Sequence, residues 1–185
     1  MTPPRWDVRR RDRADRSHPL PGHGPDVILD NIRSAFNVGS IFRTCDAAGV
    51  RHLYLAGITA LPPNPRLLKA SLGAEAMVSW SHELSTIGVV ESLRARGIKI
   101  VSVELTGRSR PFTEVEYPAQ TAFVFCHEVA GVSVPILDAS DEVIEIPMLG
   151  KKNSLNVATS VGIVLFEWVR RRLSPPTESG AAPAP

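Results

Sequence analysis

The segment from Ile146 to Arg172 joins a polar, glycine-containing loop to a long apolar stretch with helical periodicity. Asn153, Ser154 and Asn156 crowd one turn at the expected helix start, and a Lys-Lys pair precedes them. One side-chain oxygen is enough to cap a helix, so the cluster has more hydrogen-bonding capacity than capping requires. Helix starts also bind ligands through their free backbone N–H groups. The cluster therefore indicates either a ligand site or a heavily capped helix.

A second polar cluster lies nearer the N-terminus and decides between these interpretations. Residues Val27 to Val50 predict a short apolar strand, a polar turn containing Asn37, and a helix that carries Arg43 and ends at Gly49. A third segment, FVFCHEVAGVS, places Glu128 just after an apolar strand. In combination, the three segments form a pattern that is known from a protein family.

The pattern resembles the SpoU branch of the SPOUT methyltransferases, the TrmH-like RNA ribose methyltransferases. The family's first motif carries an Asn and an Arg, matched here by Asn37 and Arg43 in NVGSIFRT. Its second motif is a strand followed by Gly-x-Glu and then Gly. This chain keeps Glu128 and Gly131 but has Cys126 where the first glycine is usual.

The third motif of the family is matched by Ile-Pro-Met at 146–148 and by Ser-Leu-Asn-Val at 154–157. The resemblance covers about residues 26–172, with three motifs in the right order and spacing. It implies an α/β fold whose C-terminal part forms a trefoil knot, and a homodimer that uses the last helix. It also implies S-adenosylmethionine as the cofactor and a ribose 2′-hydroxyl of RNA, either tRNA or rRNA, as the methyl acceptor.

In the family, three loops hold the cofactor largely through main-chain groups. Gly107, Gly131 and Gly150 would let backbone approach a ligand closely, although each of them is also compatible with a plain turn. The resemblance assigns cofactor binding to the residues that match these loops, which are Leu105, Thr106, Gly107, Cys126, Glu128, Gly131, Ile146, Met148, Ser154 and Leu155.

On the acceptor side, the resemblance assigns Arg43 to the ribose 2′-hydroxyl. The competing interpretation is a surface arginine paired with Asp46, three residues further along the helix. Because a guanidinium stays protonated at neutral pH, two versions of the role remain. Either the site perturbs Arg43 strongly, or Arg43 holds the adjacent phosphate and stabilises developing alkoxide charge while the proton leaves elsewhere. Glu128 would orient Arg43 through a charge-assisted bond. The other residues assigned to the catalytic set are Asn37, Ser154 and Asn156.

Cys126 is the one departure from the motifs, because it adds a side chain at a wall where the family has backbone against the cofactor. A rival hypothesis is therefore a catalytically inactive RNA-binding relative. Retention of Arg43, Glu128, Ser154 and Asn156 argues against it. An α/β enzyme acting on a small metabolite would leave the motif combination unexplained.

The elements that must position these residues alternate along the chain. The apolar runs predict strands near 26–30, 52–56, 76–80, 98–104, 121–126 and 142–146. The periodic segments predict helices near 37–48, 65–71, 84–96, 133–139 and 154–172. Strands that are apolar along their whole length are typical of a mostly parallel sheet with helices on both faces. The last helix is apolar nearly all round, which indicates burial against its own sheet and against a second subunit.

The composition fits one soluble domain. The chain has 185 residues, of which 43% are hydrophobic and 22% charged, and we expect a methyltransferase domain at 26–173. Residues 1–25 carry six arginines and predict a basic arm that is either RNA-contacting or merely solvated. Residues 174–185 are rich in Pro and Ala and predict a disordered tail. No apolar run is long enough for a membrane span or a secretory signal, so we expect a cytoplasmic protein. Cys45 and Cys126 predict buried thiols.

Overall fold

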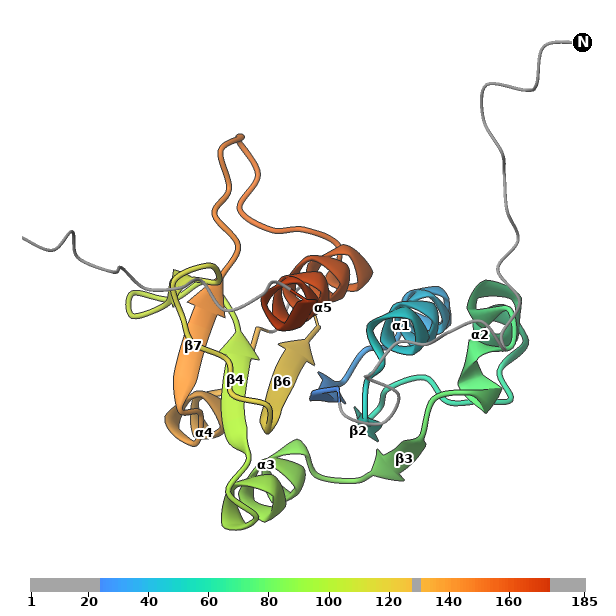
Figure 1. Cartoon of the computed structure of the whole chain (residues 1–185). Coiled ribbons are helices and arrows are strands. Elements are labelled where there is room, and N and C mark those ends of the chain that lie inside the picture. The colour runs from blue at the N-terminus through green and yellow to red at the C-terminus, as the bar shows by residue number, and fades with distance from the viewer. Residues whose placement is uncertain (1–23, 128–130, 174–185) are drawn as a thin grey trace, which may run out of the picture.

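The computed structural model describes residues 24–127 and 131–173, in which strands and helices alternate (Figure 1). The strands are β1 (Asp26–Asp30), β2 (His52–Ala56), β3 (Trp80–Glu83), β4 (Lys99–Val103), β5 (Arg110–Pro111), β6 (Thr121–Cys126) and β7 (Glu142–Glu145). The helices are α1 (Ala35–Ala48), α2 (Pro65–Ser71), the short 3-10 helix η2 (Ala74–Ala76), α3 (Thr86–Ala95), α4 (Val134–Asp138) and α5 (Val157–Leu173).

All seven strands form one parallel sheet in the order β3-β2-β1-β6-β4-β7-β5. At its centre, Leu29 of β1 lies in register with Leu55 of β2 and with Phe125 of β6. Nearly every residue of β1 and β6 is buried, as a sheet with two covered faces requires. The predicted α/β class with a mostly parallel sheet is confirmed.

The helices divide between the two faces of the sheet (Figure 1). The connections from β1 to β2 and from β2 to β3 run in one direction, so right-handed crossovers place α1 and α2 on the same face. Helix α5 packs beside α1 on that face, whereas α3 and α4 cover the other one. Helix α1 therefore lies between α5 and α2.

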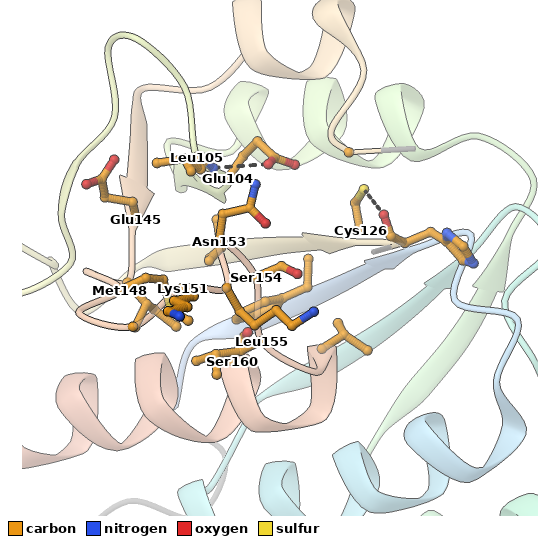
Figure 2. A pocket seen from close by; sticks show the side chains of 18 residues that line it. Glu104, Leu105, Cys126, Glu145, Met148, Lys151, Asn153, Ser154, Leu155 and Ser160 are labelled. Carbon is orange, nitrogen blue, oxygen red and sulfur yellow. Dashed lines mark hydrogen bonds between the residues drawn. The ribbon is translucent and has the colours of Figure 1, made fainter. Parts of the chain in front are cut away.

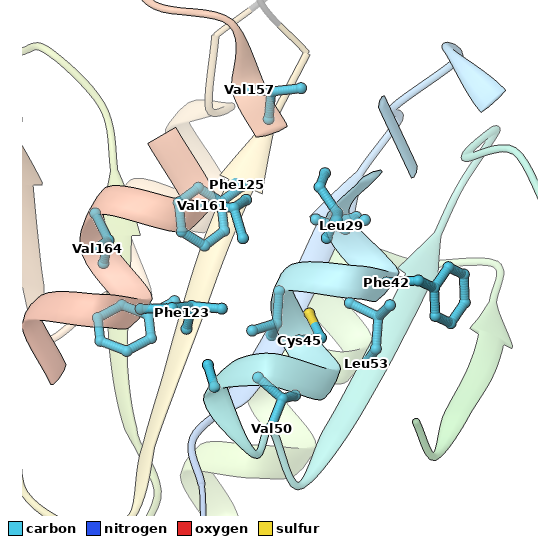
Figure 3. Close-up of a cluster of buried hydrophobic side chains, with 14 of the residues drawn as sticks. Leu29, Phe42, Cys45, Val50, Leu53, Phe123, Phe125, Val157, Val161 and Val164 are labelled. Atoms are coloured by element: carbon cyan, nitrogen blue, oxygen red, sulfur yellow. The ribbon is translucent and has the colours of Figure 1, made fainter. Parts of the chain in front are cut away.

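The larger core lies between the sheet and the helices α1, α2 and α5 (Figure 3). Because side chains alternate along a strand, Leu29 and Phe123 point into this core, whereas Ile28 and Val124 point toward α3. Phe42 of α1 is fully buried in the larger core. The core thus fixes the start of α1 and the start of α5 against the same strands.

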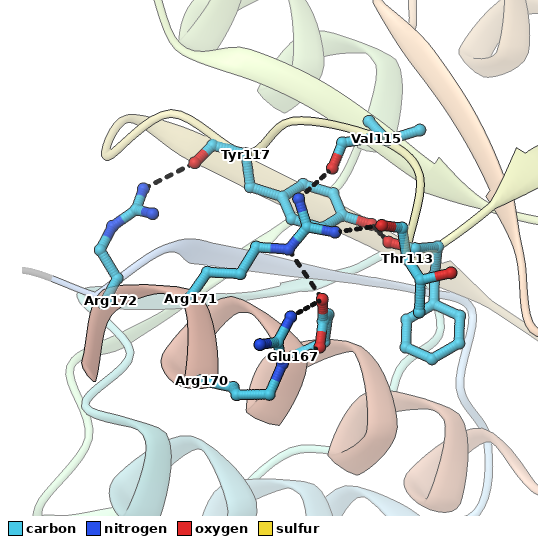
Figure 4. Close-up of polar contacts among 8 residues, drawn as sticks. Thr113, Val115, Tyr117, Glu167, Arg170, Arg171 and Arg172 are labelled. Atoms are coloured by element: carbon cyan, nitrogen blue, oxygen red, sulfur yellow. Dashed lines mark hydrogen bonds and ion pairs between the residues drawn. The ribbon is translucent and has the colours of Figure 1, made fainter. Parts of the chain in front are cut away.

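The C-terminal end of α5 is anchored by a polar cluster (Figure 4). Glu167 is only 8% exposed and accepts hydrogen bonds from Arg170 Nε at 2.8 Å and from Arg171 Nε at 2.7 Å. These bonds, with Arg170 contributing most, lower the pKa of Glu167 to about 2. Arg171 also donates to the carbonyls of Val115 and Thr113, at 2.6 and 2.5 Å. The cluster ties α5 to the segment between β5 and β6.

Several element boundaries differ from the predicted ones. The strand expected at 76–80 lies at Trp80–Glu83, because η2 and a turn occupy the preceding residues. Helix α5 starts three residues later than position 154. Strand β5 has only two residues, too few to leave a pattern in the sequence. The strands at 26–30, 52–56 and 121–126 match the prediction at both ends.

The chain termini fall largely outside the described residues, which leaves out the predicted tail and residues 1–23 of the predicted arm. Gly24 and Pro25, assigned to that arm, are instead buried against the domain. The Gly24 N–H donates to the Gly49 carbonyl at 3.1 Å, and the Arg51 N–H donates to the Pro25 carbonyl at 3.0 Å. None of the helices in the described part of the chain is long and apolar enough to cross a membrane.

Candidate active site

A pocket of about 430 Å³ lies at the carboxyl ends of β4, β6 and β7 (Figure 2). Glu104, Cys126 and Glu145 line it where these strands end, and the segment 146–155 and the first turn of α5 complete it. In open parallel sheets, ligands bind outside the carboxyl ends of the strands. The volume is within the range of about 300–1,000 Å³ that is usual for small-molecule sites.

Most residues predicted to bind a cofactor line this pocket. They are Leu105, Cys126, Gly131, Ile146, Met148, Ser154 and Leu155. Thr106 and Gly107 do not line it, because they belong to a turn that Ser109 closes by donating to the Thr106 carbonyl at 2.8 Å. A Cβ on Gly107 would meet nothing within 4 Å, as expected for a plain turn residue. Glu128 lies outside the described residues.

The polar cluster before α5 divides into a cap and two pocket residues. Asn156 caps the helix, since the Ala158 N–H donates to Asn156 Oδ1 at 3.0 Å. Asn156 Nδ2 also donates to Asn37 Oδ1 at 3.2 Å, which joins the third sequence motif to the first. Asn153 and Ser154 line the pocket (Figure 2). Capping therefore accounts for only one of the three polar residues.

Glu104, at the end of β4, holds two walls of the pocket together (Figure 2). Its Oε1 accepts the Leu105 N–H at 3.0 Å, and its Oε2 accepts the Val132 N–H at 2.9 Å. Gly131 adopts a φ of +66°, and a Cβ there would lie 3.1 Å from Glu104 Oε2. The carboxylate thus fixes the loop after β6 against the loop after β4, and glycine at 131 leaves room for it.

Glu145, at the end of β7, fixes the segment around β5 beside the pocket. Its side chain accepts a hydrogen bond from Ser109 Oγ, and its carbonyl accepts the Phe112 N–H at 2.9 Å. The motif comparison did not identify Glu104 or Glu145 as pocket residues. The only available indication was that each is an acidic residue directly after apolar strand residues.

Cys126 is only half-buried, so the prediction of a buried thiol is wrong for this residue, which is a pocket-wall residue and not a reactive thiol. Burial, with smaller contributions from the charges of Asp30 and Glu104, raises the pKa of its thiol to about 12. The group stays protonated at neutral pH, and a protonated thiol is a poor nucleophile. Cys45 is fully buried in the core, as predicted, and burial raises the pKa of its thiol strongly.

Arg43 lies on the exposed side of α1 and does not line the pocket of its own chain. Arg43 lies six positions after Asn37 on this helix, so the two side chains point about 120° apart around its axis. Within residues 24–127 and 131–173, Arg43 forms no ion pair with Asp46. The structure thus brings Asn37 and Asn156 together beside Ser154 and leaves Arg43 outside the pocket.

The pocket combines an apolar wall with negatively and positively charged side chains. Phe125 and Val157 supply apolar surface, Glu104 and Glu145 supply carboxylates, and the lysine pair follows β7. No thiolate is present at Cys126 to form a covalent intermediate, so the arrangement suits binding and alignment of a small polar molecule with an apolar part.

Comparison with known proteins identifies relatives over most of the chain. The model of the SpoU rRNA Methylase family matches residues 25–166. The tRNA (guanosine(18)-2'-O)-methyltransferase of Aquifex aeolicus is 35% identical over 153 residues, which cover 79% of this chain and 69% of the relative. The enzyme of the same name from Thermus thermophilus is 35% identical over 147 residues, covering 80% of this chain and 75% of the relative.

The fold is also that of a solved methyltransferase. The AdoMet-bound rRNA methyltransferase from Sinorhizobium meliloti superposes with a TM-score of 0.76 at 31% sequence identity. The match covers 82% of this chain and 57% of that one. The chain therefore belongs to the SpoU rRNA methylase family, as its three sequence motifs indicate.

Proposed function

We propose that this chain transfers the methyl group of S-adenosylmethionine to a ribose 2′-hydroxyl of tRNA or rRNA. The observation that carries the proposal is the pocket at the carboxyl ends of β4, β6 and β7, because segments of all three loops expected to hold the cofactor meet there. The names of the relatives support the same reaction, since they are ribose 2′-O-methyltransferases of tRNA.

The pocket fits S-adenosylmethionine in its size and in its donor set. Leu105 and Leu155 offer apolar contacts, and Ile146 and Met148 bring the loop after β7 to the pocket wall. The carboxylates of Glu104 and Glu145 suit a ligand with cationic groups. The bound cofactor would supply an activated methyl group, and the proposal also places Thr106, Gly107 and Glu128 in the loops that surround it. A trefoil knot formed by the C-terminal part of the chain belongs to the same proposal.

The acceptor side consists of residues at or outside the pocket mouth. Arg43 is assigned to the RNA, where a permanently protonated guanidinium can hold a phosphate and stabilise charge that develops on the ribose oxygen. The position of Arg43 outside the cofactor pocket is compatible with this role, because the RNA reaches the bound cofactor from the outer side of the pocket. Asn37 and Asn156 hold the two motif loops in register through their hydrogen bond. Glu128 is assigned to orienting Arg43.

A homodimer is the second part of the proposal. One side of α5 packs on the sheet and on α1, yet Phe166 and Leu173 remain 48% and 51% exposed. A second copy of the chain would cover this apolar surface. Sedimentation at low micromolar concentration should report a dimer, and a stable monomer would contradict this part. A cytoplasmic location, where tRNA and rRNA are substrates, completes the proposal.

Nucleoside mapping by mass spectrometry tests the reaction. RNA from cells with and without the gene should differ by one 2′-O-methylated nucleotide. Arg43→Ala should lower the single-turnover rate ~10²–10³-fold, as expected for loss of a transition-state contact, with cofactor affinity nearly unchanged. A folded protein that binds RNA but no S-adenosylmethionine in titration calorimetry would favour the inactive RNA-binding alternative instead.

A further inference from the structure

Cationic side chains are sorted between the two edges of the sheet. At the edge where the strands begin, four cations share three carboxylates, whereas Arg96 and Arg172 form no ion pair with a described residue. The ion pairs there are Arg51–Asp26, Arg94–Asp141, Lys99–Glu142 and Arg110–Glu142. These side chains contribute little net positive potential, because each lies against a carboxylate.

At the opposite edge, exposed cations lack such partners. We define the basic surface as Arg33, Arg66, Lys69, Lys151 and Lys152. None of the five forms an ion pair with another described residue, and all five are exposed. Four acids at this edge are engaged elsewhere. Asp30 is buried and bonded to Thr86, and Glu75 is bonded to Ser71. Glu104 and Glu145, which line the pocket with the lysine pair, accept hydrogen bonds from the Val132 N–H and from Ser109 Oγ.

The segments that carry the basic surface are joined to one another. The loop before α5 is linked to α1 by the hydrogen bond from Asn156 to Asn37. The loop before α1 is linked to the loop before α2, because the Ala60 N–H donates to the Ile32 carbonyl at 3.0 Å. Helices α1 and α2 pack together closely at Gly39. Packed helices lie about 8–10 Å apart, so the surface extends roughly 20 Å from the pocket to α2.

An exposed aromatic side chain lies within this surface. Phe36, in the first turn of α1, is 62% exposed and directly precedes Asn37. Phe42, six positions further along the same helix and on another face of it, is fully buried, so the exposure of Phe36 is not a general property of α1. Proteins that bind single-stranded nucleic acid usually stack unpaired bases on aromatic rings that lie between cations. Every base can stack in this way because every base has a π-face.

We propose that the basic surface binds the phosphodiester backbone of the RNA substrate beside the methylated nucleotide, and that Phe36 stacks on a neighbouring base. This inference rests on the proposed function, since it names where the RNA of that reaction lies. RNA is favoured over an acidic protein because the surface combines unpaired cations with an exposed aromatic ring and ends at the pocket. Phosphate contacts of this kind position the substrate and carry little sequence information.

Two variants with the same loss of charge test the proposal. Arg66→Gln/Lys69→Gln removes two cations of the basic surface, and the matched control Arg94→Gln/Arg110→Gln removes two ion-paired cations. If each removed contact contributes ~0.7–0.9 to the log–log salt slope, the first variant should bind RNA roughly 25–60-fold more weakly at 0.1 M salt, with a flatter slope. The control should bind as the parent protein does. Equal behaviour of the two variants would overturn the proposal.

Further measurements separate this inference from the proposed function. Titration calorimetry with S-adenosylmethionine should give the same affinity for both variants and for the parent protein. Absence of cofactor binding by the parent protein would refute the proposed methyl transfer. The difference in RNA affinity between the two variants would still show whether the basic surface binds RNA. Competition by polyglutamate as strong as that by RNA would overturn RNA as the occupant.

Phe36→Ala tests the stacking contact. It should weaken RNA binding about 5-fold or more and leave the salt slope unchanged, because stacking releases no counterions. Leu84→Ala, at a side chain that is 89% exposed and outside the basic surface, is the control and should bind as the parent does. If Phe36→Ala alters the oligomeric state measured by sedimentation and leaves RNA affinity unchanged, Phe36 belongs to a subunit interface and its role in stacking is overturned.

Discussion

Replacing Gly131 by alanine should weaken cofactor binding in a way that a matched glycine elsewhere does not. Gly131 has a φ of +66°, a conformation that costs an L-residue about 1–2 kcal/mol. The added Cβ would lie 3.1 Å from Glu104 Oε2, so the carboxylate must shift. This oxygen accepts the Val132 N–H at 2.9 Å, and losing a hydrogen bond to a charged group costs about 1.5 kcal/mol or more. The displaced wall should lower affinity for S-adenosylmethionine ~5–30-fold, corresponding to about 1–2 kcal/mol.

Gly97→Ala is the control for Gly131→Ala. Gly97 has a φ of +75°, and a Cβ there would meet nothing within 4 Å. The backbone penalty is therefore shared by the two variants, whereas the contact with Glu104 occurs only at Gly131. Urea denaturation should show both variants destabilised by about 1 kcal/mol or more. Titration calorimetry should show reduced cofactor affinity only for Gly131→Ala. Parental affinity in that variant would refute the role given to Glu104 and to the loop after β6.

Three further predictions concern Cys126, Glu167 and the N-terminal residues. Cys126→Gly restores the family's residue at the pocket wall and should bind S-adenosylmethionine at least as tightly as the parent, so weaker binding in calorimetry would show that the thiol contributes to the site. Glu167→Gln should destabilise the protein by about 2 kcal/mol at pH 7. The fall of the Glu167 pKa from 4.5 to about 2 corresponds to about 3.4 kcal/mol, of which the Gln amide retains part because its oxygen still accepts a hydrogen bond. Because the folded pKa is about 2 against an ordinary 4.5, this contribution is complete above pH 4.5 and is lost as the pH falls toward 2. Urea titrations at pH 7 and pH 3.5 should therefore show a smaller difference at the lower pH, and an equal difference would contradict the assignment. Removing residues 1–23, which leaves the buried Gly24 in place, should weaken RNA binding, flatten its salt dependence and leave the methylated nucleotide unchanged. An unaltered slope would identify the arm as a solvated leader.

The sequence predicts those strands whose own residues carry a clear apolar pattern. The strands at 26–30 and 121–126 are apolar along their length, and a parallel sheet covered on both faces needs this. The strand at Trp80–Glu83 was misplaced because its own residues are mixed, whereas the apolar residues just before it belong to η2 and a turn. The insertion of β6 between β1 and β4 arises from contacts between distant segments, which no local period encodes.

The site shows the same division between motif and geometry. The motifs led to Ser154, Met148 and Gly131, which the structure places at one pocket. The motifs did not lead to Glu104, because its importance lies in a hydrogen bond across 28 residues to the backbone of Val132. A backbone partner leaves no trace in the sequence, so only the folded structure identifies such a residue.

The most direct test of the central claim is methyl transfer by the purified protein. The protein is incubated with S-adenosylmethionine carrying a labelled methyl group and with RNA from cells that lack the gene, and the digested nucleosides are analysed by mass spectrometry. We expect label on the ribose of one nucleotide and loss of this label in Arg43→Ala. A folded protein that leaves every ribose unlabelled, or places the label on a base, would contradict this claim.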